Sequence, residues 1–208
     1  SLDPLMRVGD QLVETILAHR NVTKEEAIKM AKEYLEIVGI PRDRFYDYPH
    51  QFSGGMRQRA MIAMAISTRP KLLIADEPTT ALDVIVQAQI MRLFEKLRDE
   101  LGLSIILITH DISVAMEIAD KIGVMYAGQL VEFASSYEIY NNPLHPYTKG
   151  LMEAIPNIEL EDTKLNYIPG NPPDLFNLPS GCRFHPRCNR VMEACKSREP
   201  KEIWKGDH

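Results

Sequence analysis

Two apolar runs in the middle of the chain each end in side chains that can bind a metal ion or transfer a proton. Residues 72–75 precede Asp76 and Glu77, and residues 104–108 are followed, after one threonine, by His110. If both runs are parallel strands, their carboxyl ends meet at one edge of a sheet, where such sheets bind ligands. The two carboxylates and the imidazole are therefore expected to converge.

Each of these three side chains suits a different task in phosphoryl transfer. Asp76 could hold Mg²⁺, which prefers oxygen ligands shared with substrate phosphates. Glu77 could orient or deprotonate an attacking water, and His110 could contact the transferring group. The alternative is that all three are ordinary solvated residues at strand ends, and any one of them taken singly favours that alternative.

A second candidate site is the sequence Ser53-Gly54-Gly55, which precedes an expected helix that begins near Met56. A helix N-terminus has unpaired N–H groups, and glycines permit close approach, so the arrangement can bind phosphate. A plain glycine turn capped by Ser53 is the alternative, and for three residues alone we favour it by about two to one.

Three cysteines, Cys182, Cys188 and Cys195, lie within 14 positions near the end of the chain. In a cytosolic protein such a cluster is better explained by metal than by disulfides. Zinc is one candidate, with His185 or His208 completing a Cys₃His site, but the short C-x₂₋₄-C pairs of most zinc sites are missing. Three unligated cysteines are the remaining alternative.

The elements that position these residues change in character along the chain. Residues 8–20 form an expected amphipathic helix, and Thr23 with Glu26 has the form of a capping box at the start of a second helix. The elements expected after residue 53 are a helix over 56–67, a strand over 72–75, a helix over 85–101, a strand over 104–108, and two strands over 122–126 and 129–133. The strand–helix–strand unit predicts parallel strands with a right-handed crossover.

The last third of the chain is rich in proline, since seven of the 14 prolines follow residue 150. Proline resists helix interiors and central strands, so we expect an irregular tail that wraps over the core. The fold class is therefore α/β, with three parts: a helical subdomain over 1–60, an α/β core over 61–140 and a C-terminal extension over 141–208.

Composition narrows the function classes. The net charge is −5 and the charges are well mixed, which argues against a nucleic-acid binder with a broad basic surface. No run approaches the roughly 18 apolar residues of a membrane span. The chain starts with polar residues, which argues against a signal peptide. It does not start with methionine, so we do not expect the first residue to be the natural one. We expect a cytosolic chain that is a fragment.

Three segments together resemble the ABC-type ATPases. Residues 50–59, HQFSGGMRQR, resemble the signature motif; residues 72–83, LLIADEPTTALD, resemble the Walker B strand and D-loop; residues 107–111, LITHD, resemble the switch-histidine segment. Their order and spacing are those of the family. The resemblance implies a partial P-loop NTPase fold that uses ATP and Mg²⁺.

The resemblance also implies roles for individual residues. Glu77 would be the catalytic carboxylate, Asp76 the magnesium-site residue and His110 the switch histidine. The residues that would contact ATP bound to the opposite subunit, or cross the interface with that subunit, are Ser53, Gly54, Gly55, Gln58 and Asp83. The signature departs from the common form at Phe52 and Met56, but the backbone donors remain.

The tail narrows the resemblance further. Residues 142–148 and 179–195 look like the C-terminal extension of oligopeptide and dipeptide importer ATPases, and the likeness covers essentially the whole chain. It implies three partners: a second ATPase subunit, transmembrane permease subunits and, indirectly, a peptide-binding protein. It implies no nucleic-acid partner, and it places the chain at the cytoplasmic face of the membrane. Two amphipathic helices and the lack of a strand pattern before Leu72 predict that residues 1–50 form a helical subdomain that docks against the permease; the alternative is that both apolar stripes pack against each other and the core. At the cysteines it implies a four-iron cluster, which needs one more ligand than the three present.

One motif of this family is missing. A P-loop, G-x-x-x-x-G-K-[ST], cradles the phosphates, and no Gly-Lys pair occurs in the chain. We therefore expect these 208 residues alone to be inactive, with a P-loop preceding Ser1. Two other functions compete. A soluble ABC-type ATPase would usually carry coiled-coil insertions or tandem halves, and a metal-binding module without ATPase activity would leave three motifs unexplained.

Overall fold

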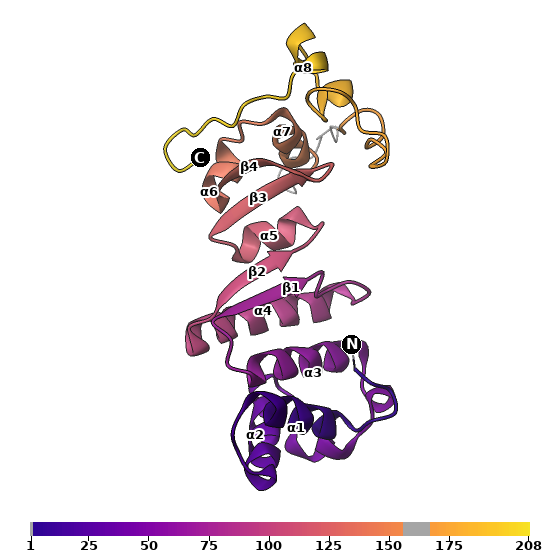
Figure 1. The fold of residues 1–208 in the computed structure, drawn as a ribbon, viewed down its shortest axis with the longest axis vertical. Helices are drawn as coiled ribbons and strands as arrows, with labels where there is room; N and C mark the ends of the chain where they lie inside the picture. The colour runs from indigo at the N-terminus through magenta and orange to yellow at the C-terminus, as the bar shows by residue number, and fades with distance from the viewer. Residues whose placement is uncertain (1, 156–166) are drawn as a thin grey trace. The chain divides into compact units, whose positions relative to one another are not determined.

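The computed structural model describes residues 2–155 and 167–208. The chain divides into two compact units, Ser1–His110 and Asp111–His208. This division differs from the expected boundaries at residues 60 and 140, which follow motifs rather than compactness, so those boundaries stay a prediction. Each unit is described by itself (Figure 1).

The first unit begins with helices, as the sequence predicts. The elements are α1 (Val8–His19), α2 (Lys24–Ile37), the short 3₁₀ turns η1 (Arg42–Tyr46) and η2 (Pro49–Gln51), and α3 (Gly54–Ser67). The expected capping box is present: Glu26 N–H donates to Thr23 Oγ1 at 3.3 Å, and Thr23 N–H donates to Glu26 Oε2 at 2.8 Å. Apolar side chains on one face of α1 and of α2 are buried, which fixes the packing of the helical part.

The same unit contains the expected strand–helix–strand unit. Strand β1 (Leu72–Asp76) pairs in parallel with β2 (Ser104–Ile108), and α4 (Val84–Leu101) connects them. Both α4 and β1 contribute buried apolar side chains, and Figure 1 shows α4 running beside β1. Gly102, with a φ of +63°, ends α4 in the left-handed conformation that suits glycine.

The other face of this two-stranded sheet is apolar and exposed. The side chains that form it are 47–60% exposed: Leu72, Ile74, Ile106 and Ile108. Strands of parallel sheets are normally buried on both faces, so this face has the composition of a buried surface.

The second unit is built on an antiparallel hairpin. Its elements are α5 (Ile112–Ile118), β3 (Lys121–Tyr126), β4 (Gln129–Ser135), α6 (Ser136–Asn141), α7 (Pro146–Glu153), the 3₁₀ turn η3 (His185–Arg187) and α8 (Glu193–Ser197). The expected turn between the strands is present at Ala127 and Gly128, both with positive φ. Ile122, Val124, Ala134 and Ile139 form its buried core.

The expected irregular tail is only partly irregular. Residues 146–153 form α7, because Pro146 lies at the first helical position, where its missing N–H costs nothing. His145 caps the helix, since its Nδ1 accepts a hydrogen bond from Tyr147 N–H at 3.1 Å. Residues 167–184 and most of residues 188–208 are irregular, as predicted.

Glu132 joins β4 to the segment that begins α7. Its side chain is buried and accepts N–H hydrogen bonds from Leu144 at 2.6 Å and His145 at 3.0 Å, while His208 Nε2 lies 2.6 Å from its Oε1. Burial alone would raise the pKa of Glu132, but these hydrogen bonds outweigh it and the pKa lies below its ordinary value. Glu132 is therefore an anionic anchor for this part of the chain.

Replacing Glu132 with glutamine is expected to lower the free energy of unfolding of the chain by about 1–3 kcal/mol at neutral pH, because an amide cannot accept all of these hydrogen bonds. Since the folded pKa is depressed, the contribution is complete above the ordinary pKa of about 4.3 and is lost as pH falls through the folded pKa. Urea unfolding at several pH values measures the difference. Glu117→Gln, at an exposed residue of α5, is the control. An equal loss of unfolding free energy in both variants, or a loss in Glu132→Gln that does not shrink in acid, would contradict the role of Glu132 as an anionic anchor.

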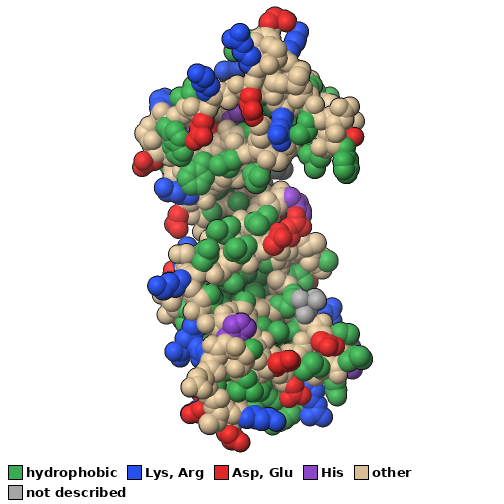
Figure 2. All heavy atoms as spheres, viewed as in Figure 1, with side chains coloured by type: hydrophobic (Ala, Val, Ile, Leu, Met, Phe, Trp, Pro, Cys, Tyr) green, Lys and Arg blue, Asp and Glu red, His purple; other side chains and the backbone are tan. Residues whose placement is uncertain are grey.

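Among the described residues, no helix is long and apolar enough to cross a membrane. On the face shown in Figure 2, basic side chains are interspersed with acidic and hydrophobic ones, as the mixed sequence predicts.

Candidate functional site

The carboxyl ends of β1 and β2 meet, as the sequence predicts. Asp76 pairs with Ile108 across the two strands, and Glu77 N–H donates to the carbonyl of Ile108 at 2.9 Å. Glu77 has a φ of +43°, a left-handed conformation that is costly for a residue with a side chain. Backbone strain of this kind is concentrated at functional sites, so it marks Glu77 as a candidate.

The side chains of Glu77 and His110 contact each other directly. His110 Nδ1 lies 3.0 Å from Glu77 Oε1, and Thr80 Oγ1 donates to Glu77 Oε2 at 2.8 Å. The hydrogen bond with His110, followed by that from Thr80, lowers the pKa of Glu77. The carboxylate thus stays ionised, and its side chain is 44% exposed and open to water. An oriented carboxylate in this state can accept a proton from water.

Thr80 is a member of this candidate site that the sequence alone did not indicate. It lies in the turn after β1, where its N–H also donates to the Glu77 carbonyl at 3.2 Å. The signal that could have found it is the threonine pair that follows Glu77 and Pro78, since a hydroxyl three residues along a turn can reach back to a carboxylate.

Asp76 is exposed at the end of β1, directly before Glu77. Among the described residues, no group of three or more His, Cys, Asp and Glu side chains is placed to hold a metal ion. Mg²⁺ does not need such a group, because it is usually bound by one or two carboxylates together with waters and substrate phosphates. A single carboxylate at this edge fits that mode of binding.

The predicted phosphate-binding segment forms the start of α3. Ser53 is the N-cap, with its Oγ accepting from Met56 N–H at 3.2 Å, and Gly54 and Gly55 form the first turn. A Cβ added at Gly55 would lie 2.6 Å from Val86 Cγ1. Gly55 is therefore required for packing against α4, which is a reason for glycine that the sequence did not reveal.

Gln58 and Asp83 lie near this helix start. Gln58 is half-buried on α3, one turn along from the glycines. Asp83 caps α4, because its Oδ1 accepts from Val86 N–H at 2.9 Å. The structure thus brings Asp76, Glu77 and His110 to one edge of the sheet. The signature segment lies at the start of α3 and Asp83 at the start of α4, and these two helices pack against each other.

The three cysteines are half-buried and unpaired in disulfides. Cys182 N–H donates to the Cys195 carbonyl at 2.9 Å, and Cys188 Sγ accepts from Arg190 N–H at 3.4 Å. In the part of the chain that the structure describes, these thiols are not grouped as a metal site, so the predicted iron–sulfur cluster is not supported and neither is zinc.

Both histidines considered as zinc ligands have other partners. His185 Nδ1 lies 2.9 Å from the Cys182 carbonyl, and His208 Nε2 contacts Glu132. A ring nitrogen held by an oxygen of the protein is not free to complete a Cys₃His site through that atom.

The sequence matches two family models. Residues 1–80 match the ABC transporter model, and residues 131–195 match the oligopeptide/dipeptide transporter C-terminal region. The first match ends just after the Glu77 turn, and the second contains Glu132 and the three cysteines.

Curated relatives match nearly the whole chain. The oligopeptide transport ATP-binding protein OppD of Escherichia coli is 52% identical over 97% of this chain, AppD of Bacillus subtilis is 50% identical over 96%, and the dipeptide transport protein DppD of Bacillus subtilis is 47% identical over 100%. The chain spans 60–62% of the length of these relatives.

A solved structure supports the fold. The ATP-binding cassette MJ0796, in a dimeric post-hydrolysis state bound to ADP and Pi, aligns with a TM-score of 0.58 and 30% identity. The alignment covers 65% of this chain and 59% of that one. The fold is that of an ABC ATPase cassette, in part.

Proposed function

Because this chain is homologous over nearly its whole length to the ATP-binding proteins of oligopeptide and dipeptide transport, we propose that it is part of an ATP-hydrolysing subunit that energises peptide import. The observation that carries the proposal is the contact between Glu77 and His110 at the carboxyl ends of two parallel strands. The match of residues 131–195 to a transporter region favours transport over a soluble role.

In the proposed reaction, Glu77 accepts a proton from the water that attacks the terminal phosphate of ATP. His110 and Thr80 hold its two carboxylate oxygens, so that the group stays ionised and fixed in direction. Asp76 would hold Mg²⁺, and the ion would supply charge stabilisation at the phosphates. Because His110 is 78% exposed, its ring can also reach a transferring phosphoryl group.

We place the start of α3 against ATP held by a second ATPase subunit. Ser53, Gly54, Gly55 and Gln58 would supply N–H and side-chain contacts to its phosphates, and Asp83 would lie at the interface between the subunits. The exposed N-cap supports this arrangement. The solved relative described as dimeric, with ADP and Pi bound, offers a precedent.

Replacing His110 with alanine is expected to lower turnover about tenfold or more in a protein that joins this chain to a P-loop. The variant should also raise the pKa of Glu77, since the imidazole is the main cause of its depression. The acid limb of the rate profile then moves to higher pH. Phosphate release measured from pH 5 to 9 checks this, with His19→Ala, at an exposed histidine of α1, as the control. An unchanged pH profile would argue against the pair.

The partners that we propose are transmembrane permease subunits at the cytoplasmic face of the membrane, which in turn receive peptide from a binding protein. The helical part of the first unit is the surface proposed to dock. Since the apolar faces of α1 and α2 are buried within the unit, the support for docking is Leu5, which is 86% exposed ahead of α1.

Cysteines introduced at Leu5 and Asp10 are expected to cross-link to the permease subunits. Phe176→Cys, at a fully exposed residue of the second unit, tests the competing surface, and the parent chain with its three native cysteines gives the background. Mass spectrometry of the cross-linked products identifies the partner. Cross-links that form from position 176 alone would transfer the docking role to the 141–208 extension.

A further inference from the structure

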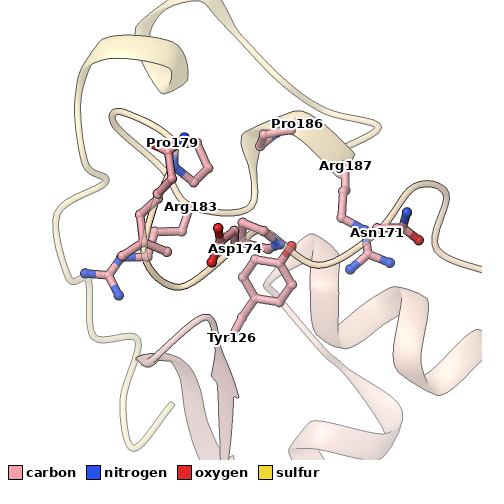
Figure 3. A pocket seen from close by; sticks show the side chains of 10 residues that line it. Tyr126, Asn171, Asp174, Pro179, Arg183, Pro186 and Arg187 are labelled. Atoms are coloured by element: carbon pink, nitrogen blue, oxygen red, sulfur yellow. The ribbon is translucent and has the colours of Figure 1, made fainter.

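A small pocket lies entirely within the Asp111–His208 unit, between the end of β3 and the irregular segment before and within η3. Its volume is about 280 Å³. Tyr126 is at its base, Asp174, Arg183 and Arg187 contribute charged side chains, and prolines form much of the wall (Figure 3). The pocket shares no residue with the Glu77–His110 site.

Tyr126 carries an unsatisfied polar group. The residue is only 5% exposed, and its hydroxyl is buried without a hydrogen-bond partner among the described residues. The ring is fixed by aromatic neighbours, with centroids 4.7 Å from Tyr147 and 5.1 Å from Phe184. Figure 3 shows the hydroxyl directed into the pocket, with Asp174 on one side and Arg187 on the other. A buried hydroxyl without a partner is costly, so a ligand atom there would be favoured.

The charged side chains are held in place by the backbone. Arg187 Nε and Nη2 donate to the carbonyls of Pro169 and Ile168 at 2.8 and 3.2 Å. Arg183 Nη1 donates to the Ala127 carbonyl at 2.5 Å. Each guanidinium is thereby oriented and retains N–H groups that the backbone does not use, which suits recognition of a carboxylate.

Asp174 offers the opposite charge. Its Oδ1 accepts from Phe176 N–H at 2.9 Å, which fixes the carboxylate at the edge of the pocket. Within the described residues, neither Asp174 nor the two arginines form an ion pair. Asp174 is exposed to water, and Arg187 lies over the Tyr126 ring with its Cζ 6.0 Å from the centroid. The pocket therefore presents a positive and a negative group, neither in an ion pair, on opposite sides of the Tyr126 hydroxyl.

We propose that this pocket binds a zwitterionic α-amino acid or short peptide. The carboxylate of the ligand contacts Arg187 and the Tyr126 hydroxyl, and its ammonium group contacts Asp174. Apolar parts pack against Pro173, Pro179 and Pro186, which line the pocket. The volume is just below the usual range for ligand pockets, which fits a ligand of one or two residues. The inference does not depend on ATP hydrolysis by the other unit.

Calorimetric titration of the full chain with the dipeptide Ala-Leu tests the proposal. The N-acetylated dipeptide lacks the ammonium group and the C-amidated dipeptide lacks the carboxylate, and each is expected to bind about tenfold more weakly or worse. Free leucine and its two capped derivatives form a parallel series. The series that binds more tightly tells whether an amino acid or a peptide is the better ligand. Both results support a site that recognises an ammonium group and a carboxylate together.

Two variants connect the binding to the pocket. Tyr126→Phe removes only the hydroxyl, keeps the ring packing, and should weaken binding about tenfold, while Tyr140→Phe, at an exposed tyrosine of α6, should not. Asp174→Asn retains an acceptor for Phe176 N–H, and should weaken binding of the free dipeptide but not of the acetylated one. Thermal unfolding verifies that the variants fold. Absence of saturable binding up to about 10 mM, or binding that is indifferent to both capping and Tyr126→Phe, would overturn the proposal.

Discussion

Glu77→Gln is expected to lower ATP turnover by at least about 100-fold in a protein that joins this chain to a P-loop, while ATP binding stays intact. The amide keeps the shape of the side chain, but it cannot accept a proton from the attacking water. Both carboxylate oxygens are already held, by His110 and Thr80, so the variant changes chemistry more than position.

Phosphate release and nucleotide binding, measured on the same preparation, separate the two effects. Glu100→Gln, at an exposed residue near the end of α4, is the matched control and should hydrolyse ATP at the parent rate. ATP-bound dimers should accumulate in Glu77→Gln, because hydrolysis no longer releases the contact across the interface. Turnover at the parent rate would move the catalytic assignment to another residue.

The 208 residues alone are expected to show no significant ATP turnover. The chain contains no Gly-Lys pair, and thus no P-loop cradle or P-loop lysine to hold the phosphates. Catalysis of phosphoryl transfer consists almost entirely of positioning and electrostatic stabilisation, so their loss costs many orders of magnitude. A phosphate-release assay on the purified chain measures this, with circular dichroism to establish that it is folded.

Two kinds of ATP turnover by the isolated chain would have different meanings. If the isolated chain hydrolysed ATP and Glu77→Gln abolished that activity, some other part of these 208 residues would have to hold the phosphates. Activity that survives Glu77→Gln would instead identify a contaminating ATPase.

The main site could be predicted from sequence because its positions follow from topology. Two apolar runs joined by a helix predict parallel strands, and parallel strands place Glu77 and His110 at one edge. The left-handed conformation of Glu77 and the hydrogen bond from Thr80 depend on the path of a single turn. Local backbone geometry of that kind has no periodic signal in the sequence.

Other features depend on contacts between segments far apart in the chain. Position 55 requires glycine because a side chain there would collide with Val86. The 142–148 segment is held in place by hydrogen bonds to the buried carboxylate of Glu132. Proline resists helix interiors, so the sequence predicts no helix over 146–153, but Pro146 lies at the first helical position, where proline is compatible with a helix. The spacing of the cysteines gave no information on where their side chains lie, and the metal prediction made from it is not supported.

A double-mutant cycle between Glu77 and His110 tests most directly whether these residues form one hydrolytic centre. ATP turnover is measured for the parent, Glu77→Gln, His110→Ala and the double variant, in a protein that joins this chain to a P-loop. Residues that act as a unit are strongly non-additive, so the double variant is expected to be within about twofold of Glu77→Gln alone. Effects that multiply, with the double variant slower by the full product of the two single losses, would contradict a shared centre.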